Sequence, residues 1–246
     1  MYFLKYRLIY PNCFVVKRMT PSKLYSMKLH TPAMRLRWQG HSCFEFDDGT
    51  RTVVIDPHDG KSIGIKPPFA TANVVLMTHN HYDHNVARII RGTHKDFLST
   101  EGYFDAAGME FEGILTCHDA AGGEERGFNI MYQFTMDGMR FCHCGDIGSI
   151  PDKNVIERIK GCDMLFIPTG EVITMEMDDV KRFIELVNPN IIVPMHYRVG
   201  GLTLPIHSID AFLDIIPEDA VDYVGNEIEF TRDDITDLKE CWIFDR

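Results

Sequence analysis

Short apolar runs alternate with polar segments along most of the chain, and their spacing indicates which elements form. Runs rich in β-branched and aromatic residues, bounded by turn residues, predict strands. Segments that stop at glycine or ahead of proline predict helices. The expected strands are residues 35–38, 42–46, 51–55, 73–78, 113–117, 139–145, 164–167 and 191–195. The expected helices are residues 85–90, 154–160, 178–187 and 209–216.

This order of elements predicts one α/β (α+β) fold. Strands and hairpins come first, and strands then alternate with helices. The 246 residues, 45% of them hydrophobic and 25% charged, suffice for one large core. We therefore expect two sheets sandwiched between helix layers.

The composition changes at residue 34. Residues 1–33 carry six basic and no acidic residues, which leaves 19 basic against 36 acidic groups, a net charge of −17, in residues 34–246. We interpret residues 1–33 as a basic N-terminal extension. An over-long gene start, a surface tail and a weak targeting segment all remain open. Residues 34–246 are expected to form the single functional domain.

Charge and cysteine content exclude several classes of protein. The net charge of −11 argues against non-specific binding to nucleic acid, which depends on lysine and arginine. No uninterrupted apolar run reaches the ~20 residues that a membrane span needs. Seven cysteines without regular spacing indicate a reducing, cytoplasmic location, and Cys142 and Cys144 are interpreted as core residues.

A dense polar cluster follows directly after the apolar run 73–78. It contains His79, His81, Asp83 and His84. Each buried polar side chain needs a partner, and a shared metal ion is such a partner. Two alternate and two adjacent residues cannot all reach one ion with good geometry. The spacing therefore predicts two metals.

Three more donors stand where later expected strands end. They are His118, Asp146 and His196. Imidazole and carboxylate groups repeated at strand exits predict that all of these side chains meet at one edge of the fold.

The ordered set of donors resembles the metallo-β-lactamase superfamily of metal-dependent hydrolases. Residues 38–44, 55–57, 118–129 and 194–197 are similar to its UPF0173-like branch, which is related to the ascorbate-phosphate lactonases. The resemblance covers roughly residues 34–230 and implies a four-layer αββα sandwich. The matching elements are His-x-His-x-Asp-His at 79–84, His118, Asp146 in His-x-Gly-Asp at 143–146, and His196.

The resemblance also implies how the metals are held. Two divalent ions, with zinc expected and manganese or iron as alternatives, suit these donors. Diiron relatives usually have glutamate where this chain has His81, which favours hydrolysis over redox chemistry. The implied ligands are His79, His81 and His118 for one metal, Asp83, His84 and His196 for the other, and Asp146 as the bridge.

The expected activity is metal-dependent, lactonase-like hydrolysis. A hydroxide that bridges the two metals would attack an ester, lactone or phosphodiester bond of a small polar metabolite. Asp83 and His41 are the expected catalytic residues: Asp83 orients the hydroxide or relays a proton, and His41 contacts substrate or braces a ligand. We expect a small-molecule substrate, no nucleic acid and no membrane, and leave a homo-oligomer open. A diiron redox enzyme and a non-catalytic metal-binding protein are the alternatives.

Several further residues have two interpretations. Asp56 either accepts a hydrogen bond from a ligand histidine or starts a turn. Arg126 and Asn129 either bind an anionic group of the substrate or fix a loop. His143 is expected to support the site without ligating. The histidines expected on the surface or in loops are His30, His58, His94 and His207.

Overall fold

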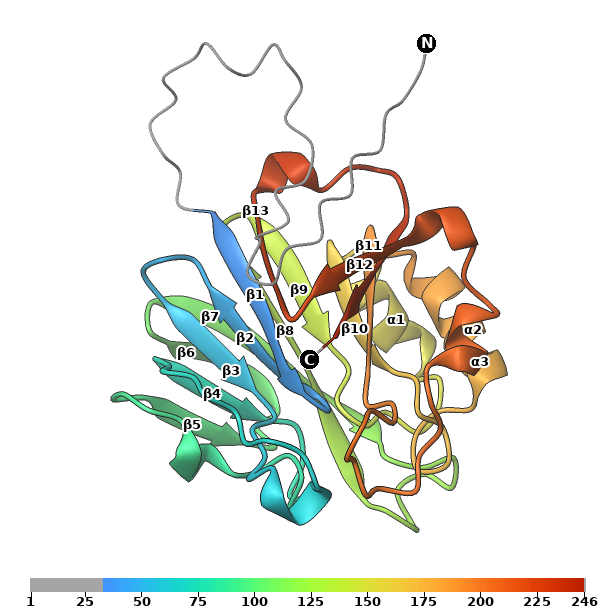
Figure 1. Ribbon diagram of the computed structural model, residues 1–246, viewed down its shortest axis with the longest axis horizontal. Coiled ribbons are helices and arrows are strands. Elements are labelled where there is room, and N and C mark those ends of the chain that lie inside the picture. The colour runs from blue at the N-terminus through green and yellow to red at the C-terminus, as the bar shows by residue number, and fades with distance from the viewer. Residues whose placement is uncertain (1–32, 246) are drawn as a thin grey trace.

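The computed structural model of the protein describes residues 33–245 and contains two packed β-sheets (Figure 1). All of the interpreted N-terminal extension except residue 33 lies outside the described residues. The first sheet has the order β13-β1-β2-β3-β4-β5. Its strands are β1 (Met34–Gly40), β2 (Cys43–Asp47), β3 (Thr52–Ile55), β4 (Val74–Met77), β5 (Lys95–Leu98) and β13 (Glu227–Phe230).

The second sheet is larger and has the order β12-β14-β11-β10-β9-β8-β7-β6. Pairing is antiparallel from β6 to β9 and parallel from β9 to β12. Its strands are β6 (Gly102–Ala106), β7 (Met109–Cys117), β8 (Phe128–Met136), β9 (Met139–His143), β10 (Met164–Pro168), β11 (Ile191–Met195), β12 (Val221–Gly225) and β14 (Glu240–Phe244).

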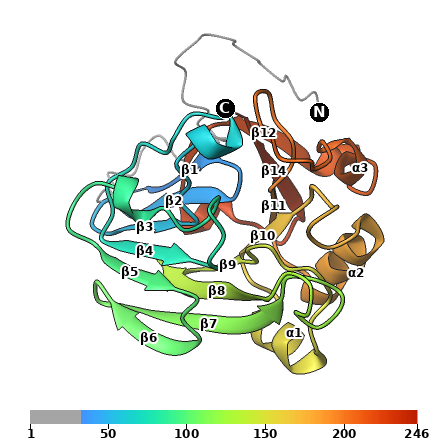
Figure 2. The same cartoon turned by 90° about the horizontal axis from the view of Figure 1, so that it is seen from below.

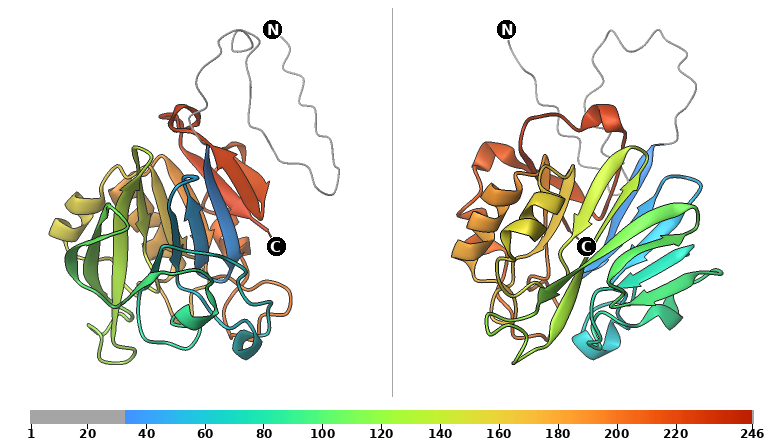
Figure 3. Two further views of the ribbon diagram at one scale, coloured as in Figure 1. Left: turned by 90° about the vertical axis from the view of Figure 1, so that its left-hand side faces the viewer. Right: turned by 180° about the vertical axis from the view of Figure 1, so that it is seen from behind.

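Helices cover the outer face of the second sheet, as the two views of Figure 3 show. They are α1 (Lys153–Ile159), α2 (Met177–Val187) and α3 (Asp210–Leu213). The Asp152 carboxylate caps α1 by accepting hydrogen bonds from the backbone N–H groups of Asn154 and Val155. Helix α2 ends at Asn188, which has a left-handed backbone conformation and is followed by Pro189.

Apolar side chains fill the space between the sheets. Phe46 of the first sheet packs against Phe134, Phe141 and Phe166 of the second, with ring centroids 5.1 to 5.2 Å apart. Every residue of β10 and β11 is buried, because helices cover one face of these parallel strands and the first sheet covers the other. This core fixes both sheets relative to each other and so fixes the loops at their edges.

The expected αββα layering is confirmed, with one difference. The outer face of the first sheet packs on Ala70, Ala72 and Ala87, which come from loops and the 3-10 helix η3 (Ala87–Ile89). A second 3-10 helix, η2 (Lys61–Ile63), packs elsewhere, with Ile63 against Leu202 and Ile206. The helix expected at 85–90 is therefore only the short turn η3, and that expected at 209–216 is reduced to the four residues of α3.

The ends of several strands meet at one edge of the sandwich, which lies at the bottom of Figure 1 and faces the viewer in Figure 2. β1, β3 and β4 run toward this edge, because β2 is antiparallel to β1 and β3 while β3 and β4 are parallel. No helix within residues 33–245 is long and apolar enough to cross a membrane.

Candidate metal centre

Five segments bring histidine and aspartate side chains to this edge. The segment that follows β4 carries four of the expected donors, and one further donor follows each of β7, β9 and β11. His41 joins them from the corner between β1 and β2. All seven predicted ligands come together, and their role as ligands stays a prediction.

Three imidazoles form the first group: His79, His81 and His118 each offer one nitrogen, and these nitrogens lie within 4.8 Å of one another. The ring centroids are 4.5 to 5.0 Å apart. His79 and His118 are buried and His81 is half-buried, so the group is open to solvent on one side only.

Four side chains form the second group: His41, Asp83, His84 and His196, again with donor atoms within 4.8 Å of one another. All four are buried. The family resemblance implied a ligand set of Asp83, His84 and His196 and left His41 as a catalytic residue, so the position of His41 among the donors was not expected.

Asp146 lies between the two groups. Its Oδ2 atom is 3.1 Å from Nε2 of His196 and 3.3 Å from Nε2 of His84 in the second group. In the first group it lies 3.5 Å from Nε2 of His118 and 3.9 Å from Nε2 of His79. One carboxylate oxygen thus faces four imidazole nitrogens, two from each group.

These contacts suit metal ligands better than a hydrogen-bonded network. Buried atoms without a hydrogen-bond partner among residues 33–245 include Nε2 of His79, His84 and His196 and Oδ1 of Asp146. Leaving such groups unpaired costs free energy. Two atoms that ligate one ion at 2.0 to 2.1 Å in tetrahedral geometry lie about 3.3 Å apart, close to the shorter Asp146 distances. The donor set therefore fits divalent cations.

Burial sets the charge of two of the imidazoles, His79 and His41. It lowers the pKa of His79 to about 2 and that of His41 to about 3, with neighbouring histidines adding to the effect. Both rings are therefore neutral at physiological pH, the form in which imidazole ligates a metal.

His84 behaves differently. Burial opposes its protonation, but the carboxylates of Asp146, Asp83 and Asp56 outweigh that effect and raise its pKa well above the usual value. Although burial acts the other way, His196 and His84 hold the pKa of Asp146 well below its usual range. The centre therefore concentrates negative charge, and a cation would replace the proton on His84.

Asp56 orients His84. Its Oδ2 lies 2.9 Å from Nδ1 of His84 and accepts a hydrogen bond of 2.8 Å from the Thr78 hydroxyl, while its Oδ1 accepts one of 2.8 Å from the Thr78 N–H. The side chain is fully buried. Of the two interpretations of Asp56, the structure favours the acceptor for a ligand histidine.

We expect Asp56→Asn to loosen His84 and weaken metal binding about 10- to 100-fold, since it replaces one acceptor oxygen by a donor. The unfolding free energy should fall by about 1 to 3 kcal/mol, because a buried polar group loses its partner. Metal titration and urea unfolding measure the two effects. The matched control is Asp163→Asn. The Asp163 carboxylate accepts a hydrogen bond from the Arg140 N–H, and Asp163 lies just before β10, at the edge of the sheet opposite the metal centre. This control should lower stability but not metal affinity, and an equal loss of affinity in both variants would contradict the prediction.

Asn129 supports Asp146. The buried amide donates to the Thr116 hydroxyl at 2.9 Å and to the Cys144 carbonyl at 2.8 Å, and its oxygen accepts from the Asp146 N–H at 3.0 Å. Of the two interpretations of Asn129, these three bonds favour the one in which it fixes the loop. Arg126 remains exposed.

Two further histidines are structural. His143 is buried with Nε2 2.9 Å from the Ser42 carbonyl, in agreement with its expected supporting role. His58 lies in a loop, one of the two positions expected for it, but it is fully buried rather than on the surface, with Nε2 3.2 Å from the Gly40 carbonyl. A loop position in the sequence did not reveal that the loop folds inward.

Sequence reasoning assigned no role to Asp119. Its carboxylate accepts hydrogen bonds from four backbone N–H groups, which holds the loop after His118 in a defined shape. Aspartate followed by two glycines was the available signal, because such carboxylates often bond to the backbone a few residues on. The four donors are Ala121, Gly123, Glu125 and Arg126.

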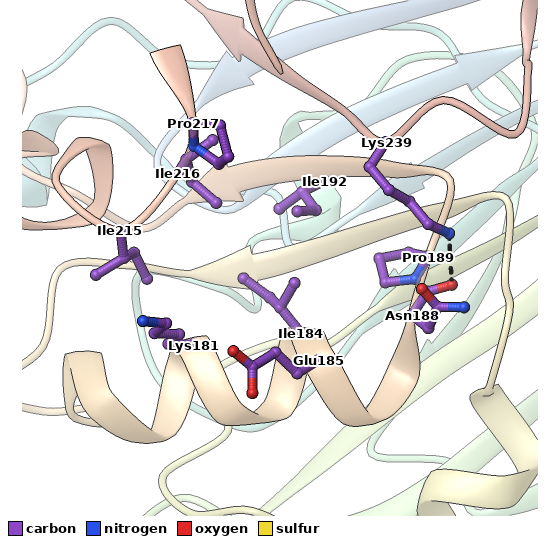
Figure 4. Close-up of a pocket in the computed structure, with 10 residues that line it drawn as sticks. All are labelled: Lys181, Ile184, Glu185, Asn188, Pro189, Ile192, Ile215, Ile216, Pro217 and Lys239. Atoms are coloured by element: carbon purple, nitrogen blue, oxygen red, sulfur yellow. Dashed lines mark hydrogen bonds between the residues drawn. The ribbon is translucent and has the colours of Figure 1, made fainter. Parts of the chain in front are cut away.

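A separate groove lies at the start of β11, whereas His196 follows the end of that strand (Figure 4). It has a volume of about 230 Å³ and an apolar lining that includes Ile184, Ile192 and Ile216. It shares no residue with the metal groups.

The chain is similar in sequence to known metal-dependent hydrolases. A model of the β-lactamase superfamily domain matches residues 35–196. A UPF0173 metal-dependent hydrolase of Thermoplasma acidophilum is 28% identical over 193 residues, which cover 69% of this chain and 85% of that protein. One from Bacillus licheniformis is 28% identical over 233 residues, covering 80% and 100% of the two chains.

Solved structures show the same architecture. A crystal structure from Thermotoga maritima, described as that of a Zn-dependent hydrolase of the metallo-β-lactamase superfamily, is 28% identical with a TM-score of 0.71. The match covers 86% of this chain and 98% of that one. A metal-dependent hydrolase of Parabacteroides distasonis, 18% identical over 77% and 90% of the two chains, shares the fold with a TM-score of 0.60.

Proposed function

The chain belongs to the metallo-β-lactamase superfamily, and from this premise we propose that it is a dinuclear metal-dependent hydrolase of ester, lactone or phosphodiester bonds in a small polar metabolite. Its UPF0173-like relatives carry the name of metal-dependent hydrolases. The number of ions, their identity and the bond that is cleaved go beyond what those names state and are proposed from the site itself.

The position of Asp146 carries the proposal of two ions. One group of donors could hold one cation, but a carboxylate oxygen that faces nitrogens of both groups can bridge two. His79, His81 and His118 would hold one ion and Asp83, His84 and His196 the other. Five imidazoles and two carboxylates suit zinc, manganese or iron, and we place zinc first.

The chain's own residues prepare the site for hydrolysis. Cations bound there would supply Lewis-acid chemistry, lowering the pKa of a water molecule toward ~7 and stabilising negative charge on a substrate oxygen. Burial alone would raise the pKa of Asp83, but the charge of His84 and the contact with His41 lower it. Asp83 therefore stays ionised and can accept a proton at Oδ2. Buried His41 and His196 exclude bulk water from that side.

The substrate is proposed to be a small molecule. The net charge of −11 disfavours a polyanion such as nucleic acid. Redox chemistry at a diiron centre is the competing function, and the imidazole of His81 in the first group supports hydrolysis over it.

Elemental analysis of protein purified without added metal tests the proposal, together with a screen of lactones, esters and phosphodiesters. We expect about two equivalents of zinc or manganese per chain, turnover that chelation abolishes, and recovery when metal is restored. His81→Ala should lower both metal content and turnover. Two equivalents of iron with a visible chromophore and no turnover would move the assignment to redox chemistry, and full metal and activity in His81→Ala would refute the ligand set.

A further inference from the structure

We propose that His41 is a fourth protein ligand of the cation held by Asp83, His84 and His196. The inference rests on the proposed metal centre and goes beyond it, because the family resemblance places no ligand at the corner between β1 and β2. His41 would thereby change from a residue beside the metals to one that binds a metal directly.

The distance from His41 to Asp83 suits two ligands of one ion. Nε2 of His41 is 3.2 Å from Oδ2 of Asp83. This separation satisfies a hydrogen bond, longer than the 2.9 Å between Asp56 and His84. It equally suits two ligands of one ion, which lie about 3 to 3.5 Å apart at metal–ligand distances of 2.0 to 2.2 Å.

Ring positions lead to the same assignment. The His41 ring centroid lies 4.2 Å from that of His196 and 5.0 Å from that of His84. In the first group, the three imidazoles that converge on one point are spaced at 4.5 to 5.0 Å. His41 is therefore close enough to both rings to share an ion with them.

The backbone is held so that this ring enters the site. His41 has φ +56°, a left-handed conformation that is uncommon for a residue other than glycine. The His41 carbonyl accepts hydrogen bonds from the Trp38 indole at 2.9 Å and from the His196 N–H at 3.3 Å. Strained conformations persist where surrounding structure enforces them, often at functional sites.

The added donor makes the two metal sites unequal. The second ion would have five protein donors when Asp146 bridges, and the first would have four. A larger donor set suits an ion of higher coordination number, whereas zinc in proteins is most often four-coordinate. The two sites should therefore bind a test cation with different affinities.

Titration of the metal-free full-length chain with Co²⁺ tests the proposal. The wild type should bind two equivalents. In His41→Gln, one equivalent should bind as before and the second should weaken by more than about 100-fold, beyond the ~10- to 100-fold typical of a lost supporting hydrogen bond. Glutamine keeps an N–H donor for Asp83, so it would preserve binding if His41 were only a support.

The matched control is His94→Gln, which alters a half-buried imidazole whose Nε2 also contacts an oxygen, the Ile90 carbonyl, but ahead of β5 and away from the donors. It should still bind two Co²⁺ ions. Two equivalents with unchanged affinities in His41→Gln would overturn the inference alone, while less than one equivalent in the wild type would overturn the proposed centre as well.

A crystal structure of the cobalt-loaded wild type gives a second measurement that does not depend on a variant folding. The proposal requires Nε2 of His41 at about 2.0 to 2.2 Å from an ion. A separation greater than about 3 Å, with Asp83 between ring and ion, would show that His41 supports Asp83 and does not ligate.

Discussion

Asp146→Asn is expected to abolish hydrolysis and to leave the chain unable to hold two ions with high affinity. Oδ2 of Asp146 faces Nε2 of His84 and His196 on one side and of His118 on the other. Asparagine has a similar size but no charge, so it cannot offset two neighbouring cations. We expect kcat/KM to fall by at least about 1000-fold, or about 4 kcal/mol of transition-state stabilisation.

The measurements are metal content per chain and kcat/KM on whichever substrate the screen identifies. Asp48→Asn is the matched control, because Asp48 is also buried and accepts backbone hydrogen bonds from Thr50 and Arg51, but in the hairpin between β2 and β3. It should keep two ions and full activity. If Asp146→Asn also kept two ions and lost less than tenfold activity, Asp146 would not be a bridge.

The sequence was sufficient to predict which donors converge, for a topological reason. His79, Asp146 and His196 each follow a strand that was recognisable from its apolar run. β9, β10 and β11 are parallel, and β3 and β4 are parallel in the other sheet. Parallel strands place their carboxyl ends at one edge, so residues far apart in sequence meet there without any further information.

Contacts between residues of different elements could not be predicted from the sequence. That Asn129 would hold Asp146 depends on the register of β7 against β8, and the inward position of His58 depends on the path of a loop. Strands β5, β6, β8, β12, β13 and β14 were not predicted either. Exposed residues alternate or predominate in β5 and β6, so no apolar run marked them. β8 and β14 are mostly buried, and their apolar residues were not recognised as strands.

His41 shows the same limit within the site. Its neighbour Gly40 and the motif around it indicated a functional corner, but one residue in a hairpin carries no periodic signal. Only the packing of the first sheet against the second, where the His196 N–H donates to the His41 carbonyl, places the ring 4.2 Å from that of His196. Sequence spacing predicts ligands that lie in one segment or at the ends of recognisable strands. It does not predict a donor such as His41, which lies in a separate turn.

Gly148→Ala is expected to displace His118 and so to prevent metal binding by the group of His79, His81 and His118. A Cβ atom at residue 148 would lie 2.3 Å from Asp119 N and 2.4 Å from the His118 carbonyl carbon, both backbone atoms that cannot swing aside. The backbone must shift by about 1 Å, a misplacement that can cost ~100-fold in rate, and overpacking should lower the unfolding free energy by about 3 kcal/mol. Urea unfolding, metal content and kcat/KM measure these effects. Gly200→Ala is the matched control, because neither glycine has a positive φ and a Cβ at residue 200 meets no atom within 4 Å. Since only the crowding differs, equal stability and equal metal content in the two variants would mean that the close approach of Gly148 does not position His118.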